Sequence, residues 1–348
     1  MRMVLSALVM LGLTSGTLIT LTSSHWFTAW MGLELTTISI IPLAIYPHYT
    51  RRVEAAAKYF LVQTSAAAVL LFSALINAWI TGQWQIEYMT HPLPTTLAVL
   101  ALAMKLGLAP LHLWLPDVLQ GLNLFTGLVV STWQKIPSFI LLIQITNPPL
   151  GVLLFLALTS IIIGGLGGLN QTQLRKILAY SSVAHLGWMT LIAYIHPALA
   201  FYAFLTYFVL TGSAFLSLIY TRSTSINEIA GSWPISPVIA ATIPLILLSL
   251  AGLPPLTGFA PKWLILNELI QHNQVTTALI ASISSLISLA FYLRICMVLA
   301  MTLTPKPSTG LAPWRAFSSS PLLPLAAITV AAIALLPFTP LMMALVSY

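Results

Sequence analysis

One stretch decides how this chain folds: Ala103-Met-Lys-Leu-Gly-Leu-Ala-Pro-Leu-His-Leu-Trp-Leu-Pro-Asp117. It places a lysine, a histidine and two prolines inside an apolar run. A charged side chain deep in lipid costs several kcal/mol, so a lysine that is kept there is a functional candidate. Pro110 lacks a backbone donor and clashes with the preceding turn, which breaks or kinks a helix. Membrane proteins tolerate broken helices where they line a cavity, and transporters build ion sites from them.

The composition makes lipid the solvent of this protein. The 348 residues are 59% hydrophobic and 5% charged, and their mean hydropathy is +0.97. Soluble domains are about one quarter charged, and no soluble fold of this size hides so much apolar surface. The formal charge of +7 comes from scattered basic residues without a continuous basic stripe, which argues against nucleic acid as a partner. The single cysteine, Cys296, excludes a disulfide framework, a cysteine-ligated zinc site and a self-contained iron–sulfur cluster.

The hydropathy pattern predicts an all-α polytopic membrane protein with about eleven transmembrane helices. A spanning helix needs about 20 mostly apolar residues. The segments that qualify are 3–22, 26–46, 56–80, 94–116, 123–144, 149–169, 174–194, 198–220, 237–271, 275–303 and 321–345. The ninth is too long for one straight span and carries Pro254-Pro255, so we expect two half-helices there. The loops are short, and the chain is expected to form a single membrane domain.

Charges in the loops test this helix count. With eleven helices, every loop lysine and arginine falls on one side of the membrane. These residues are Arg2, Arg51, Arg52, Arg175, Lys176, Arg222, Lys306 and Arg315. The opposite loops hold Glu87 and histidines but no lysine or arginine. The positive-inside rule then places the N-terminus inside and the C-terminus outside.

The deciding stretch has a second, weaker copy. Gly107-Leu-Ala-Pro-Leu-His-Leu-Trp-Leu-Pro116 resembles Gly252-Leu-Pro-Pro-Leu-Thr-Gly-Phe-Ala-Pro261. The two copies lie on helices four and nine, an odd number apart, so they run in opposite directions. This is typical of an inverted-topology repeat with a broken helix in each half and the site near their interface. We expect two five-helix repeats, residues 1–147 and 148–304, followed by a C-terminal helix in 305–348. The alternative is chance similarity between two Leu/Pro-rich segments.

A few ionisable residues remain inside the helices once the loop charges are set aside. They are Glu34, Lys105, Lys135 and Lys262, with His112 and His185 in similarly apolar surroundings. Glu34 is expected in the middle of helix two, Lys135 in the middle of helix five, and Lys105 just before the break of helix four. Any one of them could simply cap a kinked backbone or pair locally. Several at mid-span favour function, because each must be paired or hydrated to be tolerated.

The chemistry that these residue types support is a proton relay. Burial disfavours the charged form of lysine and glutamate alike, and a neighbouring opposite charge favours it. A buried Glu34–Lys105 pair would therefore hold or release a proton as the pair is made or broken. Lys135 and Lys262 would receive it, with water or histidine between them.

Other features carry less weight. Lys58 and Glu54 form an i,i+4 pair near the start of helix three, where Lys58 either snorkels or functions. Asp117 is expected at the inner end of helix four, as an entrance or a simple helix terminus. Glu268 and Arg294 are expected to pair or to snorkel. The G-x-x-x-G spacings at Gly12/Gly16 and Gly164/Gly168 favour close helix packing, and the glycines at 164–168 do not fit a dinucleotide fingerprint.

Several motifs together resemble a known family. They are Trp30-Met-Gly-Leu-Glu-Leu-Thr36, Glu54-Ala-Ala-Ala-Lys-Tyr-Phe60, Met104 to Asp117, Trp133-Gln-Lys-Ile-Pro137, Tyr180-Ser-Ser-Val-Ala-His-Leu-Gly-Trp188 and Gly252 to Trp263. The combination resembles the chain 2 family of NADH–ubiquinone oxidoreductase, which are mitochondrially encoded, vertebrate-like membrane-arm subunits of respiratory complex I. The resemblance covers essentially the whole chain. That family is similar in turn to Mrp-type cation/proton antiporter subunits.

The resemblance implies an antiporter-like subunit that couples electron transfer from NADH to ubiquinone to proton translocation. It matches the family's relay residues to Glu34, Lys105, Lys135, Lys262 and His185. Some antiporter-like relatives carry a glutamate where Lys262 stands, and this chain lacks N-terminal helices found in bacterial relatives.

The resemblance also implies partners and a location. The chain would bind no cofactor, because NAD, FMN, iron–sulfur clusters and ubiquinone are used elsewhere in the complex. Its partners would be other membrane-arm subunits and membrane lipids, with cardiolipin among the candidates. The location would be the mitochondrial inner membrane, with the N-terminus in the matrix and the C-terminus in the intermembrane space. Two alternatives from the residues alone are a stand-alone sodium/proton antiporter and a structural spacer whose buried charges are assembly contacts.

Overall fold

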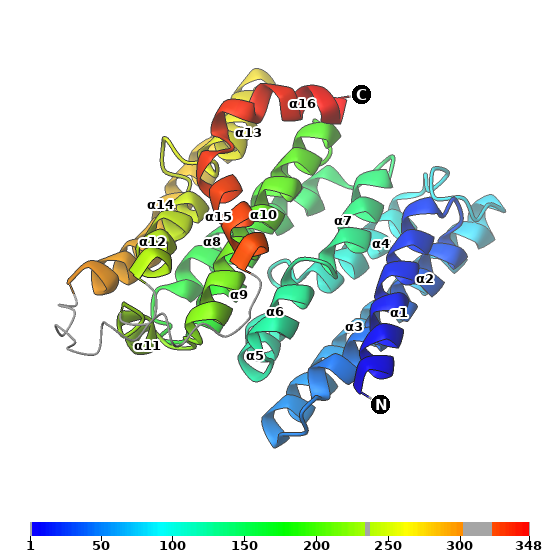
Figure 1. Cartoon of the computed structure of the whole chain (residues 1–348). Coiled ribbons are helices and arrows are strands. Elements are labelled where there is room, and N and C mark those ends of the chain that lie inside the picture. Colours follow the sequence, from blue (N-terminus) through cyan, green and yellow to red (C-terminus); the bar gives the residue numbers. More distant parts are fainter. Residues whose placement is uncertain (1, 234–236, 302–321, 348) are drawn as a thin grey trace. The chain divides into compact units, whose positions relative to one another are not determined.

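A computed structural model describes residues 2–233, 237–301 and 322–347, and the regular structure in these ranges is helical (Figure 1). The described ranges hold the helices α1 (Arg2–Thr22), α2 (Trp26–Ile45), α3 (Thr50–Thr81), α4 (Pro92–Leu106), α5 (Trp114–Gly121), α6 (Leu124–Ser131), α7 (Lys135–Gln144), α8 (Leu150–Gly168), α9 (Leu174–Ile192), α10 (Pro197–Thr221), α11 (Ile226–Ala230), α12 (Pro237–Ala251), α13 (Phe259–Gln271), α14 (Val275–Met301), α15 (Leu322–Ala334), the 3₁₀ turn η2 (Leu336–Phe338) and α16 (Thr339–Ser347).

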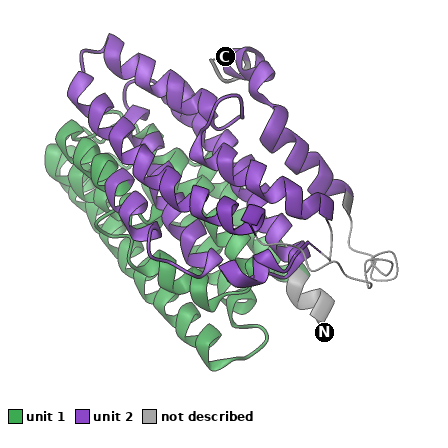
Figure 2. Cartoon of the chain, turned by 90° about the vertical axis from the view of Figure 1, so that its left-hand side faces the viewer, with its two compact units in different colours: residues 1–160 green, residues 161–348 purple. Residues whose placement is uncertain are grey.

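The chain divides into two compact units, residues 1–160 and 161–348, coloured separately in Figure 2. In the first unit α3 is central, because it packs against α2, α4 and α5, while α1 packs against α2 and α7. The predicted close packing at Gly16 is confirmed. A side chain there would lie 2.9 Å from the carbonyl oxygen of Gly32, so only glycine lets α1 approach α2 this closely.

The second unit is organised around α10, which packs against α9, α12, α13, α15 and α16. Helix α14 closes the unit from the other side, against α12 and α13. The predicted packing at Gly164 is also confirmed, because a side chain there would meet the backbone of Ala184 on α9. The core of both units consists mainly of alanine, leucine, isoleucine and aromatic side chains, as expected for helices that pack closely in lipid.

Both predicted helix breaks are present and share one backbone device. Helix α4 ends where Gly107 takes φ +81°, and α12 ends where Gly252 takes φ +83°. At each break two consecutive amides donate hydrogen bonds to one carbonyl. Gly107 and Leu108 donate to Ala103, and Gly252 and Leu253 donate to Leu248. This is the left-handed glycine termination of a helix, and proline prevents its continuation. The second half-helices are α5 and α13.

Two boundaries differ from the sequence prediction. Lys135 lies near the middle of the 21-residue span Leu124–Gln144, as predicted, but an interruption at residues 132–134 makes it the first residue of α7. The cause is Pro137, whose ring excludes the carbonyl four residues earlier and leaves a wide turn in which the Gln134 amide bonds to the Val129 carbonyl. The single C-terminal helix expected at 321–345 is instead a pair bent by 71° at the 3₁₀ turn that contains Pro337.

The structure supports a polytopic membrane protein with fewer clear spans than predicted. Six helical segments in the described ranges are long and apolar enough to cross a membrane, or seven if the bent C-terminal pair counts as one span. Shorter apolar helices at Ala7–Thr22, Pro92–Leu106 and Pro237–Ala251 occupy other predicted segments. Of the predicted inner loop charges, Lys306 and Arg315 lie outside the described residues.

Candidate functional site

Lys105 is one of the two deeply buried lysines of the first unit, together with Lys135. It lies in the last turn of α4, directly before Gly107, and only 4% of the residue is exposed. Its Nζ atom has no hydrogen-bond partner in the part of the chain that the structure describes. A buried ammonium without a partner is costly, and the negative end of the helix dipole offsets part of this cost.

Glu34 faces this lysine from α2 without touching it. Its carboxylate accepts a hydrogen bond of 3.2 Å from the hydroxyl of Thr37, and it acts on Lys105 through space. The two groups do not form the direct ion pair that the sequence suggested, since no Glu34–Lys105 contact within 4 Å occurs.

Two side chains of α3 complete the surroundings of Lys105. The Gln63 amide donates a 3.3 Å hydrogen bond to the Lys105 carbonyl, so the end of α4 is held by the backbone. The Tyr59 hydroxyl is buried and has no hydrogen-bond partner among the described residues, and it feels the charge of Glu34. The sequence analysis did not single out either residue.

Lys135 occupies a different electrostatic position. It is 2% exposed and begins α7, a helix that packs against α4. Next to it, the Gln134 amide donates a 3.3 Å hydrogen bond to the hydroxyl of Thr36 on α2. The positive end of a helix dipole opposes a cation, whereas the negative end supports one. The same charge is therefore better stabilised on Lys105 than on Lys135.

His112 lies in the turn between α4 and α5. It is buried, and its side chain hydrogen-bonds to the backbone of Pro110 inside the same turn. This contact supports the simpler interpretation of His112, in which it satisfies the backbone of the broken helix.

In the second unit, Lys262 reaches back across its break. Its Nζ donates a 2.7 Å hydrogen bond to the carbonyl of Ala251, the last residue of α12, although Lys262 itself belongs to α13. The same Nζ lies 6.0 Å from the centre of the Trp188 ring, which is the outer range of a cation–π contact. Lys262 thus closes the C-terminal end of the first half-helix.

His185 lies beside Lys262. Both residues line a cavity of about 20 Å³ together with Tyr207 of α10, which is room for one water molecule. The His185 and Tyr207 rings are 5.7 Å apart, and the Tyr207 hydroxyl is in hydrogen-bonding contact with Ser182. The structure therefore brings together two of the predicted site residues, with polar groups around them.

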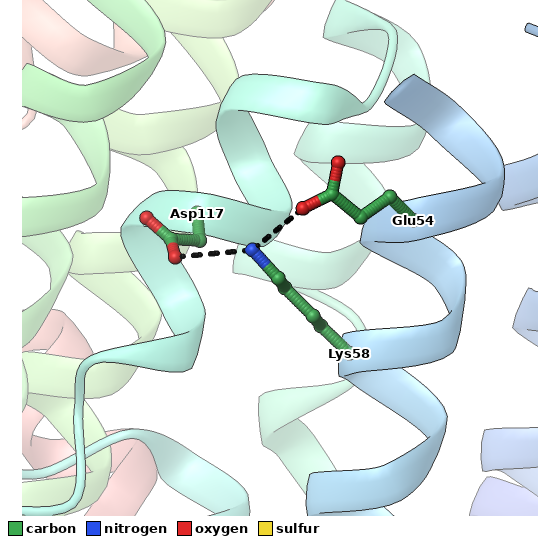
Figure 3. A network of polar contacts seen from close by, with 3 residues as sticks. All are labelled: Glu54, Lys58 and Asp117. Carbon is green, nitrogen blue, oxygen red and sulfur yellow. Dashed lines mark ion pairs between the residues drawn. The ribbon is translucent and has the colours of Figure 1, made fainter. Parts of the chain in front are cut away.

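A third group of charges lies at the start of α3 (Figure 3). Lys58 Nζ is 2.9 Å from a Glu54 carboxylate oxygen and 3.5 Å from one of Asp117, and the three side chains are about half exposed. Asp117 belongs to α5 rather than to the end of α4, so the lysine joins α3 to the second half-helix.

Two further charges, Arg294 and Glu228, hydrogen-bond to the backbone. Arg294 donates a 3.0 Å hydrogen bond to the Leu169 carbonyl, and it does not pair with Glu268 as the sequence allowed. In the loop helix α11, hydrogen bonds from Thr224 and Ser225 hold the pKa of Glu228 below its usual value. Across the described ranges, no group of three or more His, Cys, Asp or Glu side chains is placed to hold a metal ion.

The residues that sequence reasoning missed are aromatic or amide side chains. They are Tyr59, Gln63, Trp114 and Trp188, whose roles depend on contacts between helices. Tyr59 and Trp188 do lie inside quoted motifs, Glu54 to Phe60 and Tyr180 to Trp188. A polar aromatic beside a buried charge was the available signal.

Comparisons with known proteins match this architecture. The family model described as NADH:quinone oxidoreductase/Mrp antiporter, TM, matches residues 23–288, and that of the NADH dehydrogenase subunit 2 C-terminus matches 289–343. NADH-ubiquinone oxidoreductase chain 2 of Tetraodon nigroviridis is 54% identical over 338 residues, which covers 97% of each chain. The corresponding protein of Salmo salar is 52% identical over 327 residues and covers 93% of each.

Solved structures give the same result for the fold. A chain of respiratory complex I from Thermus thermophilus with bound aureothin superposes with a TM-score of 0.85 at 28% identity, covering 97% of this chain and 78% of that one. A chain of the Mrp complex from Dietzia sp. DQ12-45-1b gives a TM-score of 0.82 at 19% identity, with 97% and 76% covered, which shows a shared fold.

Proposed function

The chain belongs to the NADH-ubiquinone oxidoreductase chain 2 family, and from this premise we propose that Glu34, Lys105, Lys135, Lys262 and His185 move protons through it. In this reading it is an antiporter-like membrane subunit of respiratory complex I. The observation that carries the proposal is Lys105, a buried ammonium with no hydrogen-bond partner in the described chain, beside a separated carboxylate at the end of a broken helix.

The local electrostatics suggest how the first unit works. With Glu34 ionised, a proton is held on Lys105, where both the carboxylate and the end of α4 support the positive charge. When Glu34 accepts a proton, that support is removed and Lys105 releases its own proton. Lys135 lies at the N-terminal end of α7, where the positive end of the helix dipole disfavours its charge. It therefore holds the proton less well than Lys105 and transfers it onward.

The second unit is proposed to receive the proton on Lys262 or His185. Lys262 holds its proton against the Ala251 carbonyl, and the cavity that it shares with His185 has room for one bridging water. His112 is proposed to keep the turn of the first break in shape and to take the proton from Lys105 only through water.

The architecture extends this proposal. We take the eleven predicted segments to be spans, arranged as two inverted five-helix repeats and a bent C-terminal pair. The N-terminus would face the matrix and the C-terminus the intermembrane space of the inner mitochondrial membrane. Other membrane-arm subunits and lipids such as cardiolipin would surround the chain, while NAD, FMN, iron–sulfur clusters and ubiquinone would be bound elsewhere in the complex.

Replacing Lys105 by methionine tests the function. We expect Lys105→Met to leave the complex assembled and to lower proton pumping about a hundredfold, the loss typical of removing a proton-transfer group. The measurement is proton uptake in proteoliposomes, beside assembly on native gels. The matched control is Lys176→Met, a partly exposed lysine in the first turn of α9, which should pump normally. Normal pumping by Lys105→Met would overturn the proposal, and loss of assembly would favour the spacer alternative.

A further inference from the structure

A polar pocket opens where α3 begins and α5 lies against it. It has a volume of about 180 Å³, and its polar lining comes from Arg51, Glu54, Lys58, Asp117 and Gln120. We call these five residues the inner pocket, because the loop charges place this end of α3 on the inner side. A space of this size, lined by charged groups, holds several water molecules.

The seam between α3 and α5 continues from the pocket into the core. Ala55 and Lys58 border the pocket, and the next residue of α3 is Tyr59. The Tyr59 ring packs 6.0 Å from the ring of Trp114 on α5, one turn before Asp117. From Glu54 to Tyr59 the helix advances about 7–8 Å, so the tyrosine lies one step deeper than the ions.

Tyr59 ends this seam with an unsatisfied hydroxyl. The residue is 1% exposed, and its hydroxyl has no hydrogen-bond partner in the described part of the chain. The charge of Glu34 acts on this hydroxyl. Burying an unpaired hydroxyl is costly, so phenylalanine would be the more stable choice if the ring alone mattered.

We propose that the inner pocket is the entrance through which protons reach Glu34, and that the Tyr59 hydroxyl carries them across the dry part of the seam. This proposal rests on the proton-translocating function of the Glu34–Lys105 site and adds its supply route. The mixed charges of the pocket suit water and protons, because Arg51 and Lys58 balance Glu54 and Asp117 and leave no net charge to attract a larger anion.

The transfer balances without any further reactant. A water molecule in the inner pocket forms an O–H bond to the Tyr59 oxygen and takes a replacement proton from the bulk. At the same time the original O–H bond of Tyr59 breaks, and its proton goes to the Glu34 carboxylate, directly or through one water. Tyr59 ends as a neutral phenol, and the net result is one proton moved from the inner side to Glu34.

Tyr59→Phe in the assembled complex is the decisive variant, because it removes one oxygen atom and keeps the ring against Trp114. We expect proton pumping in proteoliposomes to fall about a hundredfold, the lower end of what a proton-transfer group supplies. The ratio of pumping rates in H₂O and D₂O should rise, because proton transfer becomes rate-limiting. A merely structural defect would lower the rate and leave the isotope ratio unchanged.

The controls separate this inference from the proposed function. Tyr202→Phe removes a hydroxyl from a tyrosine that is 2% exposed in the other unit and should change neither rate nor isotope ratio. Asp117→Asn, at the pocket, should lower the rate several-fold. If Tyr59→Phe pumps normally while Lys105→Met does not, the entrance is wrong and the function stands. If Lys105→Met also pumps normally, the function itself is wrong. An unchanged isotope ratio in a slow Tyr59→Phe complex would overturn the role of Tyr59.

Discussion

The two breaks end their helices in the same way and satisfy the freed carbonyls differently. At the first break, the Trp114 indole donates a 3.0 Å hydrogen bond to the Met104 carbonyl, and Gln63 donates to the Lys105 carbonyl. At the second break, the ammonium of Lys262 donates to the Ala251 carbonyl. In the alignment of the two copies, Phe259 stands where Trp114 does and has no donor to offer.

The difference explains why the two lysines are not equivalent. Neutral donors close the end of α4, so the ammonium of Lys105 is left without a structural task. The end of α12 is closed by the charged group itself, so Lys262 has a structural task. The same helix termination therefore leaves the buried lysine without a hydrogen-bond partner in the first unit and hydrogen-bonded in the second, within the described part of the chain.

The largest contrast is expected between the two glycines. Both take a left-handed conformation that costs alanine about 1–2 kcal/mol. A side chain at Gly252 would also lie 2.9 Å from Lys262 Cδ, whereas the nearest atom at Gly107 is 3.4 Å away. Gly252→Ala should therefore displace Lys262 and abolish pumping, and Gly107→Ala should retain most of it. Pumping and thermal denaturation of the purified complex measure both effects, and equal losses would break the comparison.

The next contrast compares one substitution at the two lysines. Lys262→Met leaves the Ala251 carbonyl without its donor, which should cost about 1–3 kcal/mol of stability. Lys105→Met removes an unpaired buried charge and no hydrogen bond, so it should be neutral or stabilising. Denaturation of the two variant complexes under the same conditions would show this. A more stable Lys262→Met than Lys105→Met would contradict our account of the two lysines.

A smaller effect is expected at Trp188. Replacing Trp188 by leucine removes the ring face near Lys262 as well as packing of a buried side chain. The double variant with Lys262→Met isolates the contact, because the Trp188→Leu effect should shrink by about 0.5–1 kcal/mol, the value of a cation–π contact at the edge of its range, once the charge is gone. An undiminished effect in the double variant would mean that Trp188 contributes packing alone.

The loop helix α11 serves as the reference for these stability comparisons, because it lies outside both breaks. The capping box formed by Ser225 and Glu228 holds the pKa of Glu228 below its unfolded value. Its stabilisation is therefore present above the unfolded pKa and is lost as the pH falls through the folded one. Glu228→Gln should be slightly less stable than the parent at pH 7, by less than any variant above, and the gap should narrow towards pH 4. A constant gap in thermal denaturation would exclude this linkage.

The sequence predicted the scaffold better than the contacts. Pro110 and Pro254-Pro255 identified both breaks because proline and glycine act locally, through a missing donor and a left-handed turn. Pro137 carried the same information about the interruption before Lys135, and it was overlooked inside an apolar run. Hydropathy does not encode which helices pack together. It therefore could not predict that Lys262 bonds to Ala251 across the break, or that Tyr59 lies near Glu34.

Helix α3 has 32 residues and so extends about 48 Å, against a hydrocarbon layer of about 30 Å. This surplus is long enough for Glu54 and Lys58, near the start of α3, to lie at the level of the lipid headgroups, where Lys58 also pairs with Asp117 of α5. Mobile ions of the surrounding solution reach that level, with a screening length near 8 Å at physiological ionic strength. The proposed entrance would then lie where salt and headgroup charge set the local proton concentration, and the lipid composition of the membrane would affect the rate of proton uptake.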